Sequence, residues 1–247
     1  IHIMTDKKEE GPTLKGICNN NVNNMPCDNL YEAFNNFIFN KDKKVLGKLL
    51  HRFKYYQNTF NLPGDIVELG VFKGSGAATW IKFLDIFECN SNKKVIGFDL
   101  FDSLNTVVEN YKNGDTMKVV YSKVNSEELS IEAIDNKLEK INVDKSKYIL
   151  VKGDVCKTTK EFVVNNPGFR ISLIYVDLDL GEPVYHSLMN LWDRLLPGGY
   201  IIFDEYEYHK FDESVGVDKF LKDKKIKYEI KSTHWIAPTS YMIKKEN

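Results

Sequence analysis

One stretch of the chain decides the fold: Gly64-Asp-Ile-Val-Glu-Leu-Gly-Val-Phe-Lys-Gly-Ser-Gly76. Residues 66–69 form an apolar run typical of a parallel strand that is covered on both faces, and a glycine-rich turn follows. Glycine lets a backbone turn sharply and approach a ligand closely. Because an acid in a buried strand needs a partner, Glu68 indicates a binding site at the end of this run. The stretch therefore predicts a nucleotide-type site.

Strand and helix patterns alternate along the rest of the chain. Four further apolar runs each end on an acid, at residues 94–99, 148–154, 171–177 and 200–204, and helical patterns separate them. The run at 171–177 is the most apolar, so we expect it at the centre of the sheet. Two closing strands are expected near 228–231 and 240–244. This order predicts an α/β fold, a Rossmann-like doubly wound and mostly parallel seven-stranded sheet with N-terminal helices.

The sequence also suggests how the chain is divided. Residues 1–28 are polar and rich in asparagine, so we expect a flexible N-terminal arm. Residues 29–247 are expected to form a single domain. Within it, two helical patterns at 29–60 have apolar stripes that fit a lid or an oligomer interface. The stretch 100–125 is irregular and polar, which suggests a second lid insertion.

Composition excludes several classes of function. The chain has 247 residues, 43% of them hydrophobic, and a formal net charge of −1, so it does not resemble a general nucleic-acid or membrane-surface binder. Its four cysteines show no CxxC spacing, which favours reduced thiols over disulfides or zinc. No run is long enough to span a membrane, and no signal-peptide pattern is present. We expect a cytoplasmic protein.

The turn itself indicates which nucleotide binds. A dinucleotide fold requires G-x-G-x-x-G, and its second glycine makes room for the pyrophosphate. Phe72 holds that position here, so its ring would crowd a pyrophosphate and Glu68 would repel one. S-adenosylmethionine (SAM) has no phosphate and carries two cationic groups, which carboxylates attract. Asp99, at the second strand end, is placed to accept both ribose hydroxyls. The residues favour a SAM site.

Every one of the five strand ends carries an acid. In doubly wound sheets, ligands bind beyond the carboxyl ends of the strands, near the topological switch point. A random solvated rim does not explain acids at all five ends, although capping of the next helix could account for Asp177 or Asp179. The acids, in strand order, are Glu68, Asp99, Asp154, Asp177 with Asp179, and Asp204 with Glu205.

Four motifs in this order resemble the macrocin O-methyltransferase (TylF-like) family. They are Ile66-Val-Glu-Leu-Gly-Val-Phe-Lys-Gly-Ser75, Gly97-Phe-Asp-Leu-Phe-Asp-Ser103, Val176-Asp-Leu-Asp-Leu180 and Pro197-Gly-Gly-Tyr-Ile-Ile-Phe-Asp-Glu-Tyr206. The resemblance covers roughly 61–244 and implies a class I SAM-dependent enzyme, many of which methylate sugar hydroxyls of natural products with Mg²⁺. It implies this cofactor-binding set: Glu68, Gly70, Val71, Gly74 and Ser75 at the methionine end, Asp99 and Ser103 at the ribose, Asp154 near the adenine, and Asp177 near the methionine part.

The same resemblance implies a metal site at Asp179, Asp204 and Glu205. Independently of it, three carboxylates on adjacent strand ends suit the oxygen coordination of Mg²⁺. The metal would lower the pKa of a bound hydroxyl, and Asp179 would act as the catalytic proton acceptor. Two residues depart from the family pattern. Glu205 replaces a second Asp, and Gly181 stands where a Tyr is usual, which puts the substrate in doubt more than the chemistry.

Substrate contacts are harder to assign. Tyr206 and His209 follow the last acidic pair and are our candidates for acceptor binding. Tyr208 and Trp235 fit stacking on a substrate, and packing at the rim explains these aromatic residues equally well. A histidine in a loop is more often neither a base nor a contact.

The leading hypothesis is a SAM-dependent, Mg²⁺-assisted O-methyltransferase that acts on a hydroxyl of a sugar or a glycosylated small molecule. We expect a small-molecule partner, no nucleic acid, no membrane, and a homo-oligomer. One alternative is a nicotinamide-dependent oxidoreductase, but Phe72 opposes it and a Tyr-x-x-x-Lys pair is missing. A non-catalytic SAM-binding protein is the other. A nucleic-acid methyltransferase is disfavoured because the chain has no basic stripe and no N-P-P-Y-like motif.

Overall fold

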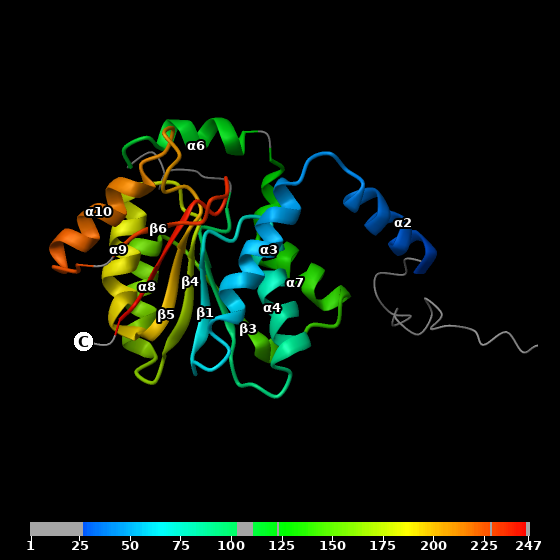
Figure 1. The fold of residues 1–247 in the computed structure, drawn as a ribbon, viewed down its shortest axis with the longest axis horizontal. Helices are drawn as coiled ribbons and strands as arrows, with labels where there is room; N and C mark the ends of the chain where they lie inside the picture. The colour runs from blue at the N-terminus through cyan, green and yellow to red at the C-terminus, as the bar shows by residue number, and fades with distance from the viewer. Residues whose placement is uncertain (1–26, 103–110, 123, 228, 246–247) are drawn as a thin grey trace, which may run out of the picture.

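Seven strands form one sheet in the computed structural model, which describes residues 27–102, 111–122, 124–227 and 229–245 (Figure 1). The strand order is β3-β2-β1-β4-β5-β7-β6, so the most apolar run, β4, lies at the centre as predicted. The first five strands are parallel, and β7 is antiparallel to both of its neighbours. The strands are β1 (Asp65–Leu69), β2 (Val95–Asp99), β3 (Tyr148–Lys152), β4 (Ile171–Val176), β5 (Leu195–Phe203), β6 (Lys231–Ser232) and β7 (Ser240–Ile243).

Helices cover both faces of the sheet, which confirms the predicted doubly wound arrangement (Figure 1). One face packs against α3 (Lys44–Gln57), α4 (Ser75–Phe87) and α7 (Ile131–Lys140). The opposite face packs against α8 (Val155–Asn165), α9 (Gly181–Leu191) and α10 (Glu213–Asp223). Helix α6 (Gly114–Tyr121) lies across one end of the sheet, and α2 (Cys27–Ile38) projects away from it.

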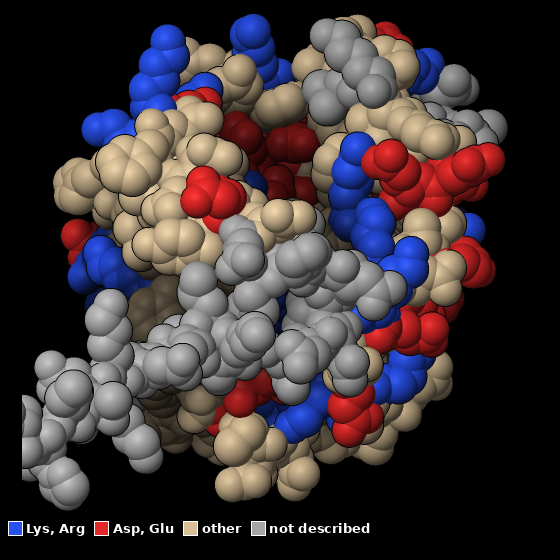
Figure 2. All heavy atoms as spheres, turned by 90° about the vertical axis from the view of Figure 1, so that its right-hand side faces the viewer, with Lys and Arg blue, Asp and Glu red and all other residues tan. Residues whose placement is uncertain are grey.

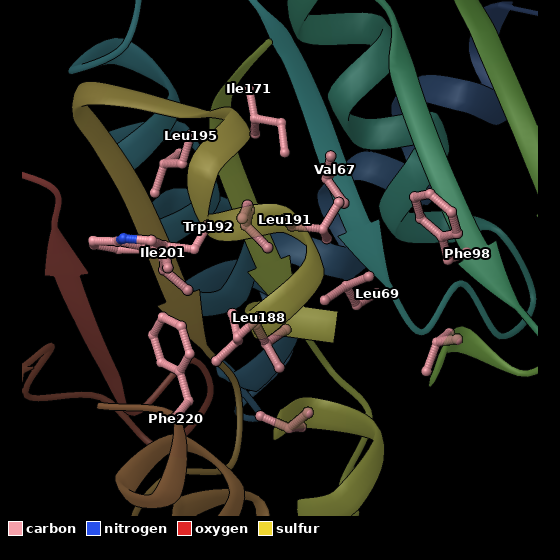
Figure 3. Packing of buried hydrophobic residues seen from close by; sticks show 14 of the residues in the cluster. Val67, Leu69, Phe98, Ile171, Leu188, Leu191, Trp192, Leu195, Ile201 and Phe220 are labelled. Atoms are coloured by element: carbon pink, nitrogen blue, oxygen red, sulfur yellow. The ribbon is translucent and has the colours of Figure 1, made fainter. Parts of the chain in front are cut away.

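Alternation along the strands sorts the core into two layers. Val67 and Leu69 of β1 face the cluster that includes Leu188 and Phe220 (Figure 3). Ile66, the residue before Val67, points to the other face and packs with Trp80 and its neighbours. The sheet is thus buried on both sides, and most of its acids lie at or just after the strand ends.

The structure corrects several predicted boundaries. The stretch 100–125 is not irregular throughout, because α6 forms within it after Asn113, a residue with φ 67°. The helical pattern between β2 and β3 does not run unbroken, because Ser130 begins a separate helix, α7, and caps it by accepting from the Ala133 N–H at its hydroxyl. The first closing strand is reduced to β6 and begins later than predicted. The arm at 1–28 lies almost entirely outside the described residues.

The N-terminal helices leave part of their apolar stripes exposed. In α3, Val45 is 68% exposed and Leu50 is 57% exposed, whereas Arg52 is buried. In α2, a stripe that includes Leu30 and Phe34 is also exposed. Because Lys48 and Arg52 of α3 are turned towards the acids at the strand ends, part of its apolar stripe faces outward, and the role of the stripe as a lid or an oligomer interface stays a prediction. No helix in the described ranges combines the length and the apolar character needed to cross a membrane.

Candidate active site

The glycine turn between β1 and α4 is held tightly at the switch point of the sheet. Gly70 has φ 91°, and a Cβ there would lie 1.9 Å from the carbonyl oxygen of Asp177. The Asp99 carboxylate fixes the turn from the other side, because its Oδ2 accepts from the N–H groups of Val71 (2.7 Å) and Phe72 (2.9 Å). Asp99 therefore has a structural role in the turn. Its predicted contact with ribose hydroxyls stays a prediction.

A first pocket, the α6 pocket, opens between the turn and α6. Asp154 caps α8 from its wall, where its Oδ1 accepts from the Cys156 N–H (3.0 Å) and from the Tyr111 hydroxyl (2.9 Å). These bonds fix one carboxylate oxygen of Asp154. The pocket has mostly apolar walls with a few convergent acids, as small-molecule sites commonly do. It is lined by Gly70, Asp99, Leu100, Tyr111, Met117, Tyr121, Asp154, Val155, Asp177, Leu178, Asp179, Leu180 and Pro183.

A second pocket, the acidic pocket, adjoins the first. The space-filling view from the side of α3 shows a hollow with acidic side chains on its floor (Figure 2). The two pockets share Gly70, Tyr121, Asp177 and Asp179 as a common wall. The acidic pocket is lined by Val45, Lys48, Leu49, Arg52, Glu68, Gly70, Val71, Phe72, Ser75, Gly76, Thr79, Tyr121, Asp177, Asp179, Asp204, Glu205 and Phe211.

The acids of this pocket repel one another. Burial raises the pKa of Asp179 to about 8, with further contributions from the charges of Asp177 and Glu205. Burial and the charge of Asp204 raise the pKa of Glu205 to about 7. Within the described residues, the side-chain oxygens of Asp179 and Glu205 form no hydrogen bond and no ion pair. Such a cluster favours a positively charged ligand.

Two basic residues of α3 enter the acidic pocket, and sequence analysis missed both. The Lys48 ammonium Nζ lies 3.0 Å from Asp177 Oδ2 and 2.9 Å from Asp204 Oδ2. One turn later, Arg52 Nη2 lies 3.4 Å from Glu68 Oε1. The spacing i, i+4 puts them on one face of the helix, which is a detectable signal. Their acidic partners lie at strand ends outside α3, so no pattern within the helix identifies them.

Glu68 has its partner in Arg52, as an acid in a buried strand requires. Its side chain is 1% exposed, and burial raises its pKa to about 7 although the Arg52 charge acts in the opposite direction. Gly76 provides the space, since a Cβ there would lie 1.8 Å from Glu68 Oε1. This glycine of the turn therefore accommodates a carboxylate. Whether Glu68 also faces the cofactor, as predicted, is untested.

The predicted Mg²⁺ ligands do not surround one point. Asp204 uses both oxygens, Oδ2 for Lys48 and Oδ1 for the hydroxyl of Tyr175. In the part of the chain that the structure describes, no three His, Cys, Asp or Glu side chains form a group that could hold a metal ion. The donor chemistry fits nevertheless, because carboxylate oxygens are the ligands that Mg²⁺ prefers. Asp177 and Asp204 already share one cation, the Lys48 ammonium.

Helix capping does not explain the acids after β4. Helix α9 begins at Gly181, and its N-cap, Leu180, makes no side-chain cap. The Gly181 N–H donates instead to Asp212 Oδ1 at 2.9 Å. A Cβ at Gly181 would lie 2.6 Å from the Asp212 carbonyl oxygen. The glycine that departs from the family pattern thus lets the start of α10 pack against α9.

The candidate substrate residues lie away from both pockets. The Tyr206 hydroxyl donates to Asp218 Oδ1 on α10 at 2.8 Å. His209 is exposed and lines neither pocket. Trp235 packs over α3 at Gly47, where a Cβ would lie 2.2 Å from its ring, which supports rim packing. Contact of Tyr206 and His209 with the acceptor stays a prediction, and Ser103 lies outside the described residues.

The chain is similar in sequence to a known family and to two curated enzymes. A model of the family described as macrocin-O-methyltransferase (TylF) matches residues 48–241. A tetracenomycin enzyme of Streptomyces olivaceus, named 8-demethyl-8-(2,3-dimethoxy-alpha-L-rhamnosyl)-tetracenomycin-C 4'-O-methyltransferase, is 28% identical over 59% of this chain and 54% of its own length. Demethyldecarbamoylnovobiocin O-methyltransferase of Streptomyces niveus is 24% identical over the same shares. The matched region thus spans about half the length of these curated relatives.

Solved structures share the fold. The calicheamicin methyltransferase CalS11 superimposes with a TM-score of 0.69 at 23% identity, covering 97% of this chain and 94% of its own. The O-methyltransferase NovP gives a TM-score of 0.67 at 20% identity, covering 80% and 79%. These likenesses confirm the predicted class I, Rossmann-like sheet.

Proposed function

Since the chain belongs to the macrocin O-methyltransferase (TylF) family, we propose that it transfers the methyl group of SAM to a hydroxyl of a sugar or a glycosylated small molecule, with Mg²⁺ assisting. The observation that carries the proposal is the common wall of the α6 pocket and the acidic pocket. A methyl donor in one and a hydroxyl in the other would meet there. The names of the two Streptomyces relatives support the choice of acceptor.

The cofactor is assigned to the α6 pocket and the glycine turn. Apolar walls suit the adenine ring, and Asp154 is held by two bonds at its edge. Asp177 reaches the common wall, where the cationic part of SAM would meet a carboxylate. The full proposed set is Glu68, Gly70, Val71, Gly74, Ser75, Asp99, Ser103, Asp154 and Asp177.

The acceptor is assigned to the acidic pocket. Asp179 belongs to the common wall, and the raised pKa of its carboxyl suits a group that accepts the hydroxyl proton at a side-chain oxygen. Because the methyl group moves in line from sulfur to oxygen, the main task of the residues is to position both ligands and keep water out. Mg²⁺, held by Asp179, Asp204 and Glu205, would supply positive charge that lowers the pKa of the acceptor hydroxyl.

Two segments complete the proposal. Residues 29–60 would cover the acidic pocket or join two copies of the chain, and the exposed apolar residues of α2 and α3 support either role. Residues 100–125 would act as a lid, supported by the position of α6 over its pocket. The absence of a cysteine pattern for disulfides supports a cytoplasmic location.

Binding of the methyl donor is the first test. Isothermal titration with SAM and with S-adenosylhomocysteine should show saturable binding, and no binding at high micromolar concentration would contradict the proposal. Fluorescence of added NADH tests the nicotinamide-dependent alternative in the same preparation. Transfer of labelled methyl groups to a panel of glycosides separates an enzyme from a protein that only binds SAM.

The metal is tested separately. Asp204→Ala should abolish Mg²⁺-dependent turnover, because it removes a carboxylate from the centre of the acidic pocket. Full activity of the unmodified enzyme in EDTA would overturn the part of the proposal that concerns Mg²⁺ and leave the donor and the acceptor in place.

A further inference from the structure

We propose that Lys48 is a tethered cation that occupies the position between Asp177 and Asp204 until a divalent cation displaces it. The inference rests on the metal part of the proposed function. It concerns a residue that the metal prediction did not include, and it makes metal binding a competition with the protein's own side chain.

The contacts show that Lys48 bridges two carboxylates. Its Nζ lies 3.0 Å from Asp177 Oδ2 and 2.9 Å from Asp204 Oδ2, so both oxygens point at one position. The two acids follow neighbouring strands, β4 and β5, and lie 129 and 156 residues from Lys48 in the chain. A cation shared by acids from two strand ends has the arrangement of a bridging metal ion, with an ammonium group in its place.

Burial makes this ammonium necessary. The Asp204 side chain is 3% exposed, and its other oxygen accepts from the Tyr175 hydroxyl. A buried carboxylate without a counter-charge is strongly destabilising. Arg52, the next basic group along α3, is paired with Glu68 and does not contact Asp177 or Asp204. Lys48 is thus the nearest counter-charge for these two acids.

Lys48 can also leave. Its side chain is 30% exposed, and its flexible four-carbon stem can carry the ammonium towards solvent while the helix stays in place. A divalent cation held by Asp204 would compete for the Oδ2 oxygen that Lys48 contacts, so it cannot bind there while Lys48 remains. Asp179 and Glu205, which have no such partner among the described residues, add to the attraction for a doubly charged ion.

The test is the affinity for Mg²⁺ of the cofactor-free, full-length chain. Magnesium chloride is titrated calorimetrically into the unmodified protein, Lys48→Met and Lys44→Met. Lys44 lies one turn earlier on α3 and is exposed, so it controls for the loss of one positive charge. We expect Lys48→Met to bind Mg²⁺ at least about tenfold more tightly, because no tethered charge has to be displaced. Lys44→Met should match the unmodified protein.

Equal or weaker binding by Lys48→Met would overturn the inference, as would no Mg²⁺ binding in any of the three proteins. If Lys48→Met does not fold without metal, Lys48→Gln gives the same comparison with a side chain that still donates hydrogen bonds. In both variants Mg²⁺ should raise the melting temperature more than it does in the unmodified protein. Titration with SAM on the same samples judges the proposed function independently, because the α6 pocket does not include Lys48.

Discussion

The α6 pocket and the acidic pocket adjoin each other but differ in how their acids are compensated. Asp99 and Asp154 in the α6 pocket accept hydrogen bonds from backbone N–H groups. Asp179 and Glu205 in the acidic pocket accept none from the residues that the structure describes, and burial raises the pKa of each. The two acids that line the α6 pocket alone, Asp99 and Asp154, are therefore compensated before a ligand arrives. The acidic pocket retains an excess of negative charge that a cation can relieve, which is typical of functional sites.

Among the tests of this contrast, we expect the largest effect from Asp179→Asn. Loss of a general base commonly lowers turnover by about 10²–10⁴-fold, and we expect an effect in this range. Binding of S-adenosylhomocysteine should change by no more than about threefold, because an isosteric amide keeps the shape of the common wall. Rates of methyl transfer and calorimetry measure the two effects. Asp85→Asn, on the exposed side of α4, is the control. An active Asp179→Asn enzyme would remove Asp179 from the mechanism.

Asp154→Ala tests the α6 pocket. It removes the cap of α8 and the partner of the Tyr111 hydroxyl, so we expect about tenfold weaker SAM binding and a loss of about 1 kcal/mol in stability. Asp144→Ala is a matched control, because Asp144 accepts from the Ser146 N–H in the same way but lines neither pocket. It should lose stability without losing affinity. Equal loss of affinity in both variants would argue against a role for Asp154 at the cofactor.

The smallest expected effect is on the pH dependence of stability. The pKa of Glu68 is raised from 4.5 to about 7 by burial, so the stability linked to its protonated form is present below pH 4.5 and is lost as the pH rises through 7. Between pH 6 and 8 we expect a loss on the order of 1 kcal/mol, or roughly 2–4 °C in melting temperature. Melting curves of Glu68→Gln should be flatter over this range. An identical slope would show that Glu68 does not titrate there.

Features that depend on local geometry could be predicted from the sequence. The glycine turn, the five strand ends and their acids follow from hydrophobic runs and from the residues beside them. The family and the fold were predicted in the same way and are confirmed. The sequence also indicated that Glu68 required a partner, although it did not identify Arg52.

The remaining features depend on distant contacts. Lys48 meets acids 129 and 156 residues away, and no pattern in α3 records this. Pairing with buried acids turns Lys48 and Arg52 inward, and no pattern in the sequence showed that this face of α3 would be the inner one. Helix α6 is only eight residues long and begins after a left-handed Asn113, so its periodicity is too short to detect.

Tyr121 at the end of α6 has a consequence for how acceptor preference could change. Its side chain lines both pockets, so a substitution there reshapes the proposed donor site together with the proposed acceptor site. Val45 and Leu49 line the acidic pocket alone. Under the proposed assignment, variation at these two positions would diversify acceptor choice without disturbing the methyl donor, whereas position 121 would be constrained by both ligands.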